Sequence, residues 1–205
     1  MGDHVCSHAK LLDLLQAFKT HSIPDNEKYN YLYQEMTDFT MACRSAYNDA
    51  PMPHNGFIAA EVAAWANLNF FYARVTQKKI QDLSLYAIFA LRTALETPPT
   101  DDAESTAPQQ CDAHVPAAAA WILGYGHDLF RKEQDLSPSD PKQGNPARGG
   151  ALWKGQAGFN KERWTLWKER FAAIAEMQDV KESTRSVAKD AVEGMERSET
   201  YELMR

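Results

Sequence analysis

Apolar positions recur at three- and four-residue spacing along most of the chain, which is the pattern of helices with one buried face. The pattern predicts helices from about Asp25 to Asn48, Asn55 to Gln77, Asp82 to Glu96 and Glu182 to Met204, with others near 11–18, near 116–133 and after Asn160. β-branched residues are sparse, and no strand is convincing. The sequence therefore predicts an all-α fold, an irregular bundle of about seven helices.

The segment 116–133 has the composition of a central helix. It contains the run AAAAWILGYGHDLF, whose small side chains let other helices approach closely, and Pro116 suits a first helical turn. Gly124 and Gly126 each cost about 1 kcal/mol of helix stability relative to Ala. We expect close backbone packing, or room for a ligand, to offset that cost.

Two segments read as exposed loops: 97–114, which is rich in Pro, Asp, Ser and Thr, and 136–158, which is rich in Pro and Gly. The first does not separate two complete halves, and the length predicts a single helical domain over 1–205. The second loop leads directly into the turn at Trp153. A loop of this length is uncommon in a compact domain unless it is functional or disordered, so a lid and a disordered segment both remain open.

The richest stretch is 149–171, GGALWKGQAGFNKERWTLWKERF. Asn160 is placed as the N-cap of a helix, and Trp164 and Trp167 share one face of that helix. Arg163 precedes Trp167 by four residues, so its guanidinium can stack on the indole or reach a carboxylate on a neighbouring helix. Two interpretations follow: a core helix with a paired arginine, or an aromatic cleft, including Trp153, for an anionic or conjugated small molecule.

The helix predicted from Asn55 to Gln77 is the second place of interest. On a helical wheel, Glu61 and Asn69 fall on either side of Trp65, within the apolar stripe. A carboxylate on such a face must be paired, protonated or turned to a wet cavity. We expect either a salt bridge from Glu61 to Arg163 or Arg92, or a polar patch inside a pocket.

Charge and composition narrow the function classes. The net charge of −6 argues against a general nucleic-acid binder and against binding to anionic membranes. No apolar run approaches membrane-spanning length, and the N-terminus lacks the features of a signal peptide. The three cysteines have no paired spacing and fit reduced thiols, which predicts a cytoplasmic protein. His4 and His8 lack an acidic ligand in register, so we expect no metal and no cofactor.

The runs WKG, GFN, ERWTLWKERF and TRSVAKDAVEGMERSE, with the earlier LRTALE and AAAAWILGYGHDLF, resemble a family of filamentous-fungal proteins known only as a domain of unknown function. Two tryptophans three residues apart, flanked by arginine and preceded by a Trp-Lys-Gly turn, are uncommon together. The resemblance implies a helical cytoplasmic protein of fungal origin. It supplies no catalytic residues and no oligomeric state.

Two function classes remain. The first is a binding protein for a small hydrophobic or anionic molecule or a protein partner, with Trp65, Asn69, Trp153, Arg163, Trp164 and Trp167 as candidate ligand-binding residues. The alternative is a cofactor-independent enzyme of the cyclase or isomerase type acting on a fungal secondary metabolite. Such an enzyme needs shape and one acid or base, for which Glu61, His127 and Arg163 are the candidates. The binding class is favoured because no catalytic constellation is visible.

Overall fold

The computed structural model describes residues 25–53 and 57–204. The chain falls into two compact units, Met1–Ala50 and Pro51–Arg205, and each is described by itself. In the first unit, helix α2 spans Asp25–Ala46, close to the bounds predicted for it. The helix predicted near 11–18 and the His4 and His8 pair lie outside the described residues.

The second unit is predominantly helical. It contains α3 (Ala59–Gln77), α4 (Leu85–Leu91), a π-helical turn (Arg92–Glu96), α5 (Ala107–Arg131), α6 (Lys161–Ala175) and α7 (Glu182–Leu203). The remaining elements are short: strand β1 (Gln134–Asp135), a 3₁₀ turn (Pro141–Gln143) and strand β2 (Gly158–Phe159), antiparallel to β1. The predicted all-α fold is confirmed, with six α-helices among the described residues.

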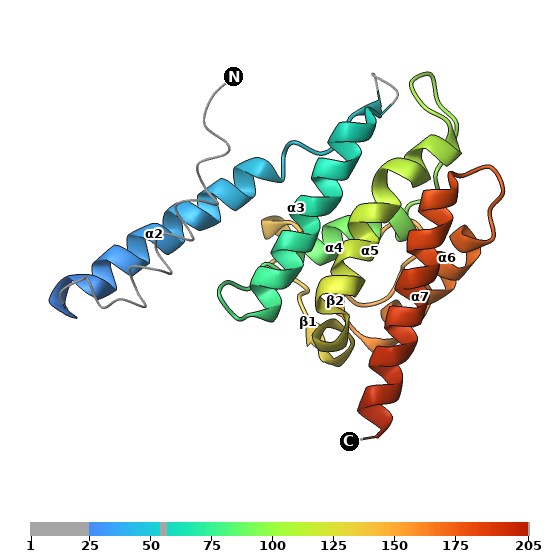
Figure 1. Cartoon of the computed structure of the whole chain (residues 1–205). Helices are drawn as coiled ribbons and strands as arrows, with labels where there is room; N and C mark the ends of the chain where they lie inside the picture. The colour runs from blue at the N-terminus through green and yellow to red at the C-terminus, as the bar shows by residue number, and fades with distance from the viewer. Residues whose placement is uncertain (1–24, 54–56, 205) are drawn as a thin grey trace. The chain divides into compact units, whose positions relative to one another are not determined.

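Three helices of the second unit, α3, α5 and α7, lie side by side and run in the same direction (Figure 1). One cavity touches Ala59, Gln109 and Ser183 near the starts of the three helices. Another touches Gln77, Asp128 and Tyr201 near their ends. Helix α5 is the middle member and packs against both α3 and α7, while α4, the π-helical turn and α6 complete the unit around it.

Helix α5 is the centre of the core, as the sequence predicted. Its residues 117–122 are buried, and Trp121 is fully so. The predicted start was wrong, however: α5 begins at Ala107, so the expected loop 97–114 is helical over its last part. A capping box fixes this start, because the Thr106 side chain accepts from the Gln109 N–H and the Gln109 side chain accepts from the Thr106 N–H. Pro116 therefore lies inside the helix and not in its first turn.

The loop 136–157 is closed at its base by β1 and β2 and held at its middle by an arginine. The Arg92 guanidinium donates to the carbonyl oxygens of Pro146 and Arg148, at 2.8 and 3.0 Å. Most side chains of this loop are exposed, but Ala147 and Ala157 are buried. Among the described helices, none is long and apolar enough to cross a membrane.

Candidate functional site

The most distinctive buried feature is an ion pair between Glu96, at the end of the π-helical turn, and Arg163, in the first turn of α6. Both side chains have no exposed surface, and the shortest N–O distance is 2.6 Å. Helix α6 begins where the sequence predicted, because Asn160 Oδ1 accepts a hydrogen bond from the Arg163 backbone N–H at 2.8 Å. That cap fixes the first turn and so the position from which the guanidinium reaches Glu96.

All five guanidinium N–H groups of Arg163 find acceptors. Nε and Nη2 donate to the two carboxylate oxygens of Glu96. Nη1 donates to the carbonyls of Ala147 and Gly158, and Nη2 also donates to that of Arg148. The pair therefore ties the long loop to α6.

The carboxylate of Glu96 has two further donors. Trp167 Nε1 donates to Oε1 at 2.7 Å, and the Gly150 N–H donates to Oε2 at 2.8 Å. The Arg163 guanidinium also lies 5.4 Å from the centre of the Trp167 ring. Both possibilities read from the sequence are realised at once: Arg163 stacks beside an indole and reaches a carboxylate. The expected partner was wrong, because Arg163 pairs with Glu96 and not with Glu61.

The aromatic residues around Arg163 form core and not an open cleft. Trp164 is 2% exposed, Trp167 1% and Arg163 0%. Trp164 Nε1 donates to Glu199 Oε1, so its polar atom is also satisfied within the protein. Trp153 is half-buried, and its Nε1 donates to the Gln156 carbonyl. Ligand binding by these residues stays a prediction, but their burial favours the core interpretation.

Asn69 and Trp65 lie at the interface between α3 and α5, where Asn69 is hydrogen-bonded to both helices. Asn69 Oδ1 accepts from Trp121 Nε1 at 2.8 Å, and Asn69 Nδ2 donates to the Trp65 carbonyl at 3.0 Å. Asn69 is fully buried and Trp65 nearly so. A polar residue on an apolar stripe is here the hydrogen-bond partner of a buried indole.

The expectation for Glu61 was wrong. Glu61 lies in the first turn of α3, and its side chain is exposed. The helical wheel placed it in the buried stripe because Trp65 is four residues away. The stripe does not extend that far, since Ile58 just before the helix is itself 45% exposed. Glu61 therefore makes no buried salt bridge.

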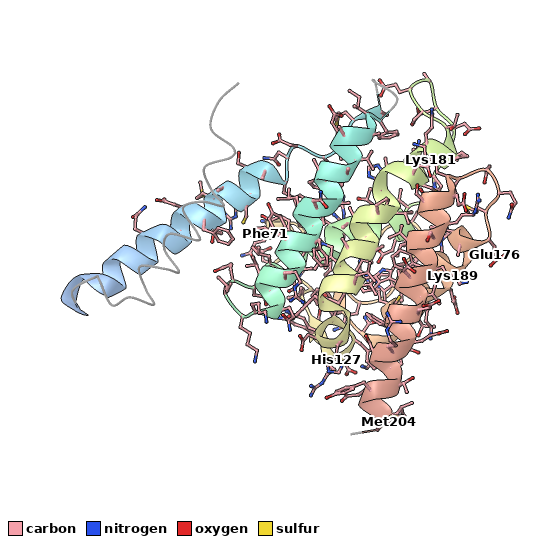
Figure 2. The ribbon with its side chains drawn as sticks, in the orientation of Figure 1. Phe71, His127, Glu176, Lys181, Lys189 and Met204 are labelled. Atoms are coloured by element: carbon pink, nitrogen blue, oxygen red, sulfur yellow. The ribbon has the colours of Figure 1, made fainter. Side chains whose placement is uncertain are left out.

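A cavity of about 430 Å³ lies over the C-terminal half of α5, and we call it the α5 groove. It is lined by residues 122–128 of α5, by Arg74 and Gln77 of α3, and by Gly194, Arg197, Ser198 and Tyr201 of α7. Figure 2 shows His127 toward the same end of the helices as Met204, with Lys181 at the other end. The groove is therefore far along the helices from their first turns.

Glycines let the helices around the groove approach closely. A Cβ on Gly124 would lie 2.8 Å from the Ala73 Cβ of α3, too close for an alanine to fit unchanged. A Cβ on Gly194 would lie 3.4 Å from the Ile122 side chain of α5. Leu123, between these two contacts, stays 46% exposed. Close packing therefore explains why α5 contains glycine at position 124. The exposed Leu123 side chain forms an apolar surface in the groove, which we call the apolar strip.

Aromatic and polar side chains complete the lining. The His127 ring meets the Tyr201 ring edge to face, with centroids 4.7 Å apart. Burial, together with the negative charges of Asp128 and Asp82, raises the pKa of Tyr125 to about 12, so its hydroxyl is neutral at physiological pH. Gln77 brings an acceptor, Oε1, that is buried and has no hydrogen-bond partner among the described residues.

The three candidate catalytic residues are not brought together. Glu61 lies near the start of α3, Arg163 is enclosed in its ion pair, and only His127 lines the α5 groove. The sequence drew attention to this part of α5 through Gly124, Gly126 and His127. It did not point to Arg74 or Arg197, because charged residues on helices usually face solvent. Gly194, a glycine inside α7, was the sequence feature that could have indicated that α7 also lines the groove.

The family model described as "Protein of unknown function (DUF3632)" matches residues 2–171. No curated protein and no solved structure matches the chain.

Proposed function

Because this chain belongs to the DUF3632 family, whose description gives no function, we propose one from its own geometry: a cytoplasmic protein that binds a small molecule in the α5 groove. The proposal keeps the binding class that the sequence favoured and moves the site. Trp164 and Trp167, beside Arg163, are enclosed in the core, whereas the groove is open to solvent at Leu123 and Tyr201.

The observation that carries the proposal is the groove itself. Its volume of about 430 Å³ is within the usual range of ligand sites, about 300–1,000 Å³. It combines an apolar strip at Leu123, aromatic rings at Tyr201 and His127, and a few polar groups from different helices. Binding sites for small molecules have this composition, with polar groups that set orientation and apolar surface that supplies affinity.

The test uses the neutral fluorophore N-phenyl-1-naphthylamine, which brightens in apolar surroundings and carries one N–H. We expect saturable binding, and we expect Leu123→Glu to weaken it by about tenfold or more, because the substitution puts a charge on the apolar strip. Leu152→Glu is the matched control, since Leu152 is 41% exposed, similar to the 46% of Leu123, and does not line the groove. Circular dichroism checks that both variants fold.

Two results would overturn the proposal. One is no saturable binding to the folded wild-type protein. The other is equal weakening by Leu123→Glu and Leu152→Glu, which would place the probe elsewhere on the surface.

A further inference from the structure

Two arginines reach the α5 groove from its two flanking helices, Arg74 from α3 and Arg197 from α7. Arg74 makes no ion pair within the part of the chain that the structure describes. Arg197 Nη1 lies 3.8 Å from Glu193 Oε2, and both of those side chains are largely exposed. An exposed pair of this kind contributes little, about 0–1 kcal/mol, so it does not prevent Arg197 from binding another anion.

The opposing negative charges are fewer. Asp128 is the acidic residue among those lining the groove. The C-terminal end of a helix also carries a partial negative charge, but this effect fades within the last turn. The groove meets all three helices in their last turns, at Gln77 of α3, Asp128 of α5 and Tyr201 of α7. Among the side chains that line it, the two arginines carry two full positive charges against the single carboxylate of Asp128.

The apolar strip and the two arginines lie in the same groove, on different elements. Leu123 is on α5, between the helices that carry Arg74 and Arg197 (Figure 1). A guanidinium presents several N–H donors in a plane and suits carboxylate, sulfonate or phosphate groups. A ligand satisfying all these groups has an apolar body and an acidic group.

Resting on the proposed function, we infer that the ligand of the α5 groove is an amphipathic organic anion. Its apolar part lies on Leu123, and its acidic group is bound by Arg74 and Arg197. The inference adds the chemical class of the ligand to the proposed site.

The experiment compares two probes that share one ring system. 1-Anilinonaphthalene-8-sulfonate differs from N-phenyl-1-naphthylamine by its sulfonate group. We expect the wild-type protein to bind the sulfonate about tenfold more tightly than the neutral probe, a difference that corresponds to about 1.4 kcal/mol. Raising the salt concentration should reduce this preference, because exposed charges are screened.

Substitutions test whether the two arginines cause the tighter binding of the sulfonate probe. The double variant Arg74→Gln with Arg197→Gln should lose the preference for the sulfonate and keep its affinity for the neutral probe. Arg131→Gln is the matched control: Arg131 is exposed on α5 and paired with Glu202, and it does not line the groove. That variant should bind both probes as the wild type does.

The outcomes separate the two proposals. If the neutral probe binds in the groove and the sulfonate binds no more tightly, the anionic class is wrong and the proposed function stands. The same conclusion follows if the preference survives in the double arginine variant. If neither probe binds the folded protein, the proposed function itself fails.

Discussion

Glu96 and Arg163 are 67 residues apart in the chain and form a two-armed ion pair, with Oε1 2.6 Å from Nε and Oε2 3.0 Å from Nη2. Neither side chain has any exposed surface. Two charges removed from water are tolerated here because each remaining donor or acceptor is also satisfied, by Trp167, Gly150 and loop carbonyls. The pair joins the π-helical turn, the long loop and α6 at one point.

Removing one partner should be costly. We expect Arg163→Met to lower the free energy of unfolding by about 3–5 kcal/mol, because Glu96 is left buried and uncompensated. Urea unfolding followed by circular dichroism measures the loss. Arg131→Gln breaks an exposed pair with Glu202 and should cost only about 0–1 kcal/mol. Equal urea midpoints for the two variants would show that the buried pair is dispensable.

The two glycines of α5 should respond oppositely to alanine. Gly124→Ala places a methyl group 2.8 Å from the Ala73 Cβ, so we expect a loss of about 1–3 kcal/mol from overpacking. Gly126→Ala meets nothing closer than 3.4 Å, so the higher helix propensity of alanine should stabilise the protein by up to about 1 kcal/mol. Thermal unfolding measures both. Adding Ala73→Gly should recover stability in the Gly124→Ala protein and not in the Gly126→Ala protein.

Asn69 should be needed for stability through its bond to Trp121. Asn69→Leu removes the acceptor of the indole N–H and leaves that donor buried, so we expect a loss of about 1–3 kcal/mol. Urea unfolding followed by tryptophan fluorescence is the measurement. The control, Asn67→Leu, changes an exposed residue of the same helix. A normal urea midpoint for Asn69→Leu, with altered probe binding, would instead favour the ligand role predicted from the sequence.

His114 should make the stability depend on pH. Burial lowers the pKa of His114 below its ordinary value of 6.5. As the pH falls below that value, the unfolded chain takes up the proton before the folded one does, so stability falls until the folded pKa has been passed. Above the unfolded pKa the contribution of His114 is constant. We expect His114→Gln to reduce the loss of urea midpoint between about pH 7.5 and pH 5. An identical loss in both proteins would assign it to other groups.

The sequence predicted local features well and long-range partners poorly. The start of α6 followed from Asn160, because an N-cap acts within one turn. The partner of Arg163 did not follow, since Glu96 was read as the end of an ordinary amphipathic helix and only the tertiary fold brings the two together. The early start of α5 was missed because a Pro-rich composition concealed the Thr106 and Gln109 capping box.

The candidate site shows the same limit. Two glycines followed by His127 marked α5 as unusual, because glycine is costly inside a helix. The other walls of the groove come from α3 and α7, whose arginines resemble any solvated residue when read along the chain. Only the packing of α5 against both α3 and α7 brings Arg74 and Arg197 to the same groove.

The π-helical turn Arg92–Glu96 sets the rotational position of the Glu96 side chain relative to α4. An ordinary α-helix advances about 100° per residue, so a chain one residue shorter in this turn would rotate the Glu96 side chain by about a quarter of a revolution. It would then point away from Arg163, and the Leu95 and Glu96 carbonyls would turn from Arg170 and Leu152, which now donate to them. We therefore expect the chain to tolerate insertions and deletions poorly in this turn.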